Sequence, residues 1–143
     1  MLFFDNLRYN KGMQDDLLLF DGLGLPLAGV RAVQQTGSTN DDALLLATQG
    51  ALDGWLVLAE EQTQGRGRSQ RRWVTATGPA LAFSLLLRPS ALEQAYIGRF
   101  TALGALSVQQ VLSELGLSAQ IKWPNDVLVN GKKVCGVLAE TLW

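Results

Sequence analysis

The segment from Gln62 to Trp73 carries the strongest chemical signal in the sequence. It has glycines at positions 65 and 67 and arginines at positions 66, 68, 71 and 72. Glycine lets a backbone approach a ligand closely, and the planar guanidinium of arginine suits phosphate or carboxylate. The pattern indicates an anion clamp, but a solvated basic loop or a patch for nucleic-acid phosphates would have the same composition. It fits neither a P-loop nor a dinucleotide-binding fingerprint, because the required glycine and lysine positions are absent.

A second polar segment, residues 122–126, reads Lys-Trp-Pro-Asn-Asp. Its proline interrupts strand pairing, so Asn125 and Asp126 are expected to project from a turn. Asp126 could hold Mg²⁺ or accept a proton, and Lys133 could neutralise a phosphate. Taken singly, these residues are also explained by a turn cap and ordinary hairpin charges. Cys135 lies in an apolar strand and is expected to be a small buried hydrophobe, not a nucleophile.

Composition excludes several classes of function. The 143 residues are 48% apolar and 17% charged, with no histidine and one cysteine. Histidine-dependent nucleophiles, histidine-based zinc sites and an internal disulfide are therefore excluded. Because no apolar stretch approaches the roughly 18 residues of a membrane span, we expect a soluble protein of the cytoplasm.

The charged residues are unevenly distributed along the chain. Residues 1–61 hold three basic and nine acidic side chains, a net charge of −6, whereas residues 62–143 hold nine basic and four acidic ones, a net charge of +5. A basic half points to an anionic partner. Acidic residues nevertheless outnumber basic ones overall, so a DNA-binding module is disfavoured.

The apolar pattern predicts the elements that position these residues. We expect residues 1–28 to form an irregular lead-in and residues 30–35 to form a strand. A helix should follow from about residue 40 to residue 48 or 49, because Ser38 or Thr39 with an aspartate three positions later marks a helix start and Gly50 marks its end. Further predicted elements are a fully apolar strand over 55–59, a loop over 60–72 and a buried strand over 81–87.

The second half of the chain predicts a long helix and a meander of strands. Apolar residues between Ile97 and Leu115 recur at helical spacing, and Gly116 supplies a C-cap. Strands are expected over 119–123, 127–129 and 134–139, with the last two joined by a type I′ turn at Asn130-Gly131. Three aromatic residues are expected in the core, namely Phe83, Tyr96 and Phe100. The element order predicts an α+β fold in which a mixed β-sheet packs against helices, within one domain over residues 29–143.

Four groups of residues resemble, in order and spacing, the biotin protein ligases of the wider biotin/lipoate protein ligase family. They are Ser38-Thr39-Asn40, then Gln62 with Gly65-Arg66-Gly67-Arg68 and Trp73, then Lys122-Trp123-Pro124-Asn125-Asp126, and lastly Lys133 to Leu138. The match covers about residues 30–140. It implies the α+β fold of that family's catalytic domain.

The resemblance implies an enzyme that uses ATP and Mg²⁺ to activate biotin as biotinoyl-5′-AMP. The biotinoyl group then passes to a lysine of the biotin carboxyl carrier protein of acetyl-CoA carboxylase. A lipoate-type ligase is one alternative, and a non-catalytic remnant that binds biotin or the carrier is another. No DNA-binding winged helix precedes the matched region, so the chain resembles the short, non-repressor class.

The same resemblance assigns roles to single residues. Ser38, Thr39, Asn40 and Gln62 would face the biotin head, and Trp73 would pack over the biotin pocket. The loop from Gly65 through Gly67 to Arg68 would close over the intermediate. Catalytic roles fall to Arg66, Arg68, Lys133 and Asp126, with Asp126 the possible Mg²⁺ ligand. The remaining substrate contacts would come from Lys122, Asn125 and Gly136.

Two features depart from the family pattern. Gln70 stands where the loop usually has a further glycine, which is expected to alter loop closure. The chain also ends shortly after the last predicted strand, where the family continues with a further strand, a helix and usually a small barrel domain. From this end we expect exposed strand surface and an oligomeric or poorly soluble chain.

Overall fold

The computed structural model describes residues 26–74 and 80–142, so most of the predicted lead-in lies outside the described residues. The described residues form two compact units. The first unit runs to Gly65 and resumes over Arg72–Arg88, and the second takes Arg66–Arg71 and the chain from Pro89 onward. No linker composition in the sequence signals this division.

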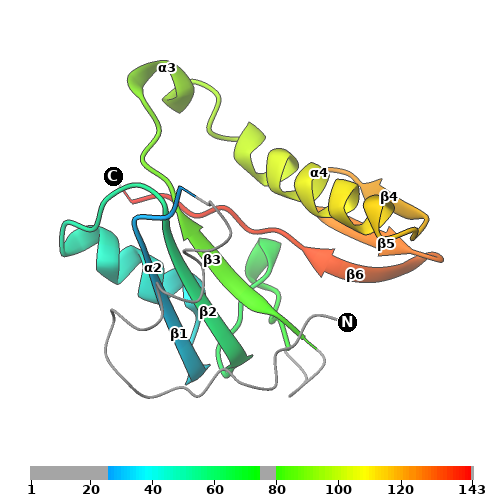
Figure 1. Ribbon diagram of the computed structural model, residues 1–143, viewed down its shortest axis with the longest axis horizontal. Coiled ribbons are helices and arrows are strands. Elements are labelled where there is room, and N and C mark those ends of the chain that lie inside the picture. Colours follow the sequence, from blue (N-terminus) through cyan, green and yellow to red (C-terminus); the bar gives the residue numbers. More distant parts are fainter. Residues whose placement is uncertain (1–25, 75–79, 143) are drawn as a thin grey trace. The chain divides into compact units, whose positions relative to one another are not determined.

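The first unit is a three-stranded sheet with a helix on one face (Figure 1). Its elements are β1 (Gly29–Thr36), α2 (Thr39–Thr48), β2 (Trp55–Gln62) and β3 (Ala82–Leu86). Strands β1 and β2 are parallel, with α2 as the crossover between them, and β2 and β3 are antiparallel. The mixed sheet confirms the α+β prediction.

The core of the first unit lies between α2 and its sheet. Ala43 and Leu46 of the helix pack on Val57 of β2, which is fully buried. The helix ends where predicted, since Gly50 has a φ of +86°, a conformation that costs a residue with a side chain about 1–2 kcal/mol. Arg88 donates hydrogen bonds to the carbonyl oxygens of Ala47 and Ala51, which gives the helix C-terminus a cationic partner.

Two predictions about strands in the first unit are wrong. The expected loop over 60–72 begins late, because β2 continues to Gln62. The neighbouring strand β1 pairs Gln35 with Glu61 and Thr36 with Gln62, so these polar residues have backbone partners despite their polarity. Strand β3 is buried on one face only: Ala82 and Ser84 are buried, whereas the intervening Phe83 is 51% exposed. Strand β3 is half-buried because a helix covers only one face of its sheet.

The second unit is an antiparallel meander packed against a helix (Figure 1). Its regular elements are the 3₁₀ turn η1 (Arg68–Gln70), α3 (Ala91–Gln94), α4 (Arg99–Glu114), β4 (Ala119–Lys122), β5 (Asp126–Val129) and β6 (Lys132–Gly136). Ala105 of α4 and Val127 of β5 are fully buried. The type I′ turn is confirmed, since Asn130 and Gly131 have φ values of 51° and 74°.

Three details of the second unit differ from prediction. Strand β6 spans 132–136 instead of 134–139, because pairing with β5 begins directly after the turn. The helix α3 was not predicted; its start is a capping box in which Ser90 and Glu93 exchange hydrogen bonds. The expected core aromatics lie nearer the surface, with Tyr96 54% exposed and Phe100 half-buried. No helix among the described residues is long and apolar enough to cross a membrane.

Candidate functional site

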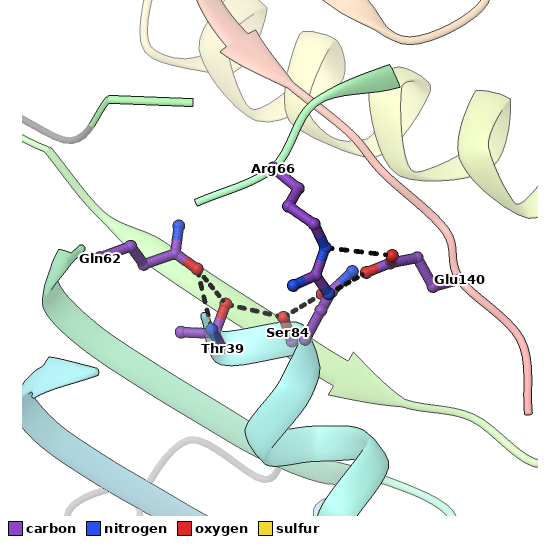
Figure 2. Close-up of polar contacts among 6 residues, drawn as sticks. Thr39, Gln62, Arg66, Ser84 and Glu140 are labelled. Atoms are coloured by element: carbon purple, nitrogen blue, oxygen red, sulfur yellow. Dashed lines mark hydrogen bonds and ion pairs between the residues drawn. The ribbon is translucent and has the colours of Figure 1, made fainter. Parts of the chain in front are cut away.

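The first unit holds a partly buried cluster of neutral polar side chains, which we call the neutral cluster: Thr39, Asn40, Gln62 and Ser84 (Figure 2). Thr39 is only 3% exposed and is the first residue of α2. Its backbone N–H cannot bond within the helix, and instead it donates to Oε1 of Gln62 over 2.8 Å. The Thr39 hydroxyl lies 3.0 Å from the same oxygen. Gln62, at the end of β2, therefore caps the helix.

Ser84 joins the neutral cluster from β3 and was not among the predicted site residues. It is 7% exposed, and its Oγ lies 2.8 Å from the Thr39 hydroxyl and also contacts the Asn40 side-chain amide. The sequence does contain a signal for it, since Ser84 is the one polar residue in the apolar run 81–87. A buried hydroxyl requires a partner, and here it finds two.

Ser38 is buried at 4% exposure and occupies the N-cap position of α2. Its side chain makes no capping hydrogen bond, so the predicted capping signal places the helix start correctly while the bond itself comes from Gln62. Asp42 accepts a hydrogen bond from the Thr36 hydroxyl over 2.7 Å. Carboxylates in the first turn also favour the positive end of the helix.

Of the two glycines in the basic segment, Gly65 is explained by a close backbone contact. A Cβ on Gly65 would lie 2.7 Å from the carbonyl oxygen of Trp73, whose N–H donates to the Gly65 carbonyl over 2.8 Å. Gly67 donates its N–H to the carbonyl of Arg71 over 2.7 Å. Trp73 is half-buried and belongs to the first unit, and residues 66–71 belong to the second.

Arg66 and Arg68 of this segment already have partners within the second unit. Arg66 forms an ion pair with Glu140, in which Nη2 lies 2.9 Å from Oε2 and Nε lies 3.3 Å from Oε1 (Figure 2). Arg68 donates to Oδ1 of Asn125 over 3.1 Å. Glu140 was not predicted as a site residue, because nothing in its sequence surroundings distinguishes it from other surface acids.

Lys133 and Asp126 form a further ion pair in the second unit, with Nζ and Oδ1 separated by 2.7 Å. Lys133 lies on β6 and Asp126 lies on β5. The pairing of these two strands is irregular between Val127 and Leu128, which shifts the residue register between them. Oδ1 of Asp126 is buried and makes no hydrogen bond of good geometry, so the Lys133 ammonium is its principal partner. We call these two pairs, with the Arg68–Asn125 contact, the charged pairs.

Three further site predictions are placed near the charged pairs. Gly136 lies opposite Asp126 across β5 and β6, where it adds no side chain. Lys122 lies opposite Asp126 on the other side, but its exposed side chain makes no ion pair with the described residues. Cys135 is half-buried, and burial raises the pKa of its thiol above the ordinary value, opposed by the nearby Lys133 charge. The thiol is therefore protonated at neutral pH, and Cys135 is less buried than predicted.

The described residues do not fit a magnesium site built by the protein alone. Among them, no group of three or more Asp, Glu, Cys or His side chains is gathered as a metal site. Asp126 is a single carboxylate, and its buried oxygen already faces an ammonium group that would repel a cation. We derive no step through a metal ion.

Comparison with known proteins identifies the family of the chain. Residues 31–142 match the biotin/lipoate A/B protein ligase family, and the chain belongs to that family. It is 44% identical over 104 residues to the bifunctional ligase/repressor BirA of Bacillus subtilis, covering 72% of this chain and 32% of that protein. It is 35% identical over 135 residues to the biotin–[acetyl-CoA-carboxylase] ligase of Mycobacterium tuberculosis, covering 91% and 50%.

A solved structure shows the same relation. The biotin protein ligase of Aquifex aeolicus in complex with biotin and ATP matches with a TM-score of 0.60 and 32% identity, covering 78% of this chain and 46% of that one. The chain thus spans between about a third and a half of the length of the relatives described. The resemblance inferred from the sequence motifs is confirmed at the level of family and fold.

Proposed function

We propose that this chain binds biotin and ATP and takes part in forming biotinoyl-5′-AMP in the cytoplasm, for transfer to a lysine of a carrier protein. The observation that carries the proposal is the neutral cluster, which buries uncharged donors and acceptors at the start of α2. Hydroxyl and amide groups suit an uncharged ureido ring, whereas a charged ring would call for a counter-charge. The relatives' names and the biotin and ATP bound to the Aquifex protein support the same ligand.

The proposed reaction gathers negative charge in both steps. A biotin carboxylate oxygen forms a bond to the α-phosphorus of ATP, and the bond to the bridging oxygen breaks, releasing pyrophosphate. The amine of the carrier lysine then forms a bond to the biotinoyl carbonyl carbon, AMP leaves with the bonding electrons, and the amine loses a proton. Cationic side chains that hold carboxylate and phosphate oxygens would stabilise both transition states.

Arg66, Arg68 and Lys133 are the side chains suited to that role. In the structure each contacts an oxygen of the chain itself, namely those of Glu140, Asn125 and Asp126. Each of these oxygens occupies a position where a ligand oxygen would accept hydrogen bonds from the same donors. We propose that Arg68 holds the phosphate of the adenylate and that Lys133 holds the biotin carboxylate, with Asp126 positioning Lys133.

Biotin-dependent exchange of labelled pyrophosphate into ATP tests the proposal. We expect exchange with biotin and none with lipoate, which also separates the lipoate-type alternative. Lys133→Met should abolish exchange, while the matched variant Lys132→Met at the neighbouring lysine should retain it. Failure of folded wild-type protein to exchange pyrophosphate in response to biotin would overturn the proposed activity.

A further inference from the structure

The orientation of the Gln62 amide follows from the donors around it. A backbone N–H only donates, so the Gln62 atom 2.8 Å from the Thr39 nitrogen is the carbonyl oxygen. The Thr39 hydroxyl oxygen lies 3.0 Å from this same carbonyl oxygen. Two oxygens this close need a proton between them, and the carbonyl oxygen has none. The hydroxyl proton of Thr39 therefore points to Gln62.

The same counting fixes the direction of the Ser84 hydroxyl. Thr39 has given its proton to Gln62, so across the 2.8 Å contact it accepts the proton of Ser84. The Ser84 hydroxyl also faces Oδ1 of Asn40, which is a second acceptor for the same proton. Ser84 thus donates to Thr39, and Thr39 donates to Gln62.

This chain of donors leaves Gln62 with its nitrogen turned away from Thr39. Nε2 faces the Gly65 backbone side, where a Cβ would lie 3.3 Å from it, and it makes no hydrogen bond with the described residues. An amide nitrogen offers two N–H donors and no acceptor. A ligand at this position must therefore present an acceptor, such as a carbonyl oxygen, to Gln62.

We propose that Ser84 is a positioning residue: its hydroxyl acts through Thr39 to hold the Gln62 amide with its nitrogen toward the ligand, so that the site selects a carbonyl acceptor over a donor. This rests on the proposed biotin site. Ser84 touches no ligand in this account. It acts because a buried hydroxyl of Thr39 without a donor would be free to turn from Gln62.

Two ligands that differ at one position test the orientation of the Gln62 amide directly. Biotin carries a ureido oxygen, whereas 2-iminobiotin, protonated at neutral pH, carries an N–H donor in its place. Wild-type protein should bind biotin more tightly in calorimetry, and Gln62→Glu, which offers only acceptors, should reverse the preference. Retention of the biotin preference by Gln62→Glu would overturn the assigned orientation. Absence of biotin binding by the wild type would instead count against the proposed function.

A double-mutant cycle tests whether Ser84 acts through Thr39. Ser84→Ala should weaken biotin binding by about three- to tenfold, as expected for loss of one buried hydrogen bond, and Ser84→Thr should restore it. In a Thr39→Val background, which lacks the hydroxyl, Ser84→Ala should have no further effect. Independent, additive losses would contradict the proposal. Thermal unfolding of each variant, with Ser107→Ala as a serine control in the second unit, separates binding losses from loss of fold.

Discussion

The neutral cluster and the charged pairs differ in solvent exposure and in charge. In the neutral cluster, Thr39 and Ser84 are 3% and 7% exposed, and their hydroxyl groups hydrogen-bond to other members of the cluster. In the charged pairs, Arg66 and Glu140 keep side-chain exposures of 37% and 30%. Burial fixes the first group, while solvent reaches the second.

The energies of the two groups differ accordingly. A half-exposed ion pair contributes only about 0–1 kcal/mol, because water competes for both partners. A buried donor left without a partner costs about 1–3 kcal/mol. We infer that the side chains of the neutral cluster stay in place when a ligand binds. The cationic side chains of the charged pairs, in contrast, can release their protein oxygens and bind ligand oxygens.

The largest expected effect comes from removing a charged-pair donor. Arg68→Ala should weaken binding of a non-hydrolysable adenylate analogue by about ten- to a hundredfold, since a charge-assisted hydrogen bond is worth about 1.5–3 kcal/mol. Biotin alone should lose much less, because it lacks the phosphate. Calorimetry with both ligands measures the ratio, and equal losses for the two ligands would refute the assignment of Arg68 to phosphate.

Removing an internal acceptor should have a smaller effect of opposite sign. Glu140→Gln releases Arg66 from its competing carboxylate, and we expect the adenylate analogue to bind about two- to fivefold more tightly at low salt. The gain should shrink at high salt as the ion pair is screened. Glu114→Gln, a glutamate of α4 outside the charged pairs, is the control. A tenfold loss of affinity in Glu140→Gln would mean that the pair holds Arg66 in place and is not exchangeable.

Gln70 tests whether the basic segment carries strain. Its φ of 59° and that of Ser69, 57°, are left-handed, which costs a residue with a side chain about 1–2 kcal/mol. Gln70→Gly should therefore raise the free energy of unfolding by up to about 1 kcal/mol after the added chain entropy of glycine. Arg71→Gly, at an ordinary φ of −70°, should lower it. Chemical denaturation measures both, and a destabilised Gln70→Gly would show that the segment carries no such strain.

The smallest expected change is in the alkylation rate of Cys135, whose thiol lies near the charge of Lys133. Burial raises its thiol pKa, while the Lys133 charge lowers it. Alkylation needs the thiolate, so the rate should rise only above the ordinary thiol pKa of about 8.5. Lys133→Met should raise the pKa further and slow alkylation at pH 8. Gln62→Ala, in the neutral cluster, should leave the rate unchanged; a faster reaction in Lys133→Met would contradict the electrostatic account.

The sign of the corresponding stability change follows from the same pKa. Because the folded thiol holds its proton more tightly than the unfolded one, its stabilising contribution is complete below the unfolded pKa. It is lost as the pH rises through the folded value. Replacement by Cys135→Ser should remove this pH-dependent contribution in unfolding measured from pH 7 to 10.

The sequence predicted the helix start and the type I′ turn because each depends on local residues. Asn130-Gly131 requires left-handed φ values that few other pairs accept, and the structure has them. The sequence could not predict Glu140 as the partner of Arg66, since 74 positions separate them. Ser84 could have been suspected from its polarity within an apolar strand, but its contact with Thr39 depends on how β3 pairs with β2.

Pattern also failed where burial depends on tertiary cover. The run 81–87 reads as fully buried, yet only alternate side chains of β3 meet α2. Likewise, Tyr96 is exposed beside Arg99, whose guanidinium lies 4.2 Å from its ring centroid. Apolar character alone does not specify how many faces a neighbouring element covers.

Titration of biotin into the wild-type chain and two variants, followed by calorimetry, tests the central contrast most directly. The account predicts saturable one-to-one binding to the wild type. Gln62→Ala should weaken biotin binding by at least about tenfold, since it removes both a ligand donor and the cap of Thr39. Arg68→Ala should stay within about threefold of the wild type, because biotin carries no phosphate. No binding by folded wild-type protein, or equal weakening in both variants, would contradict the account.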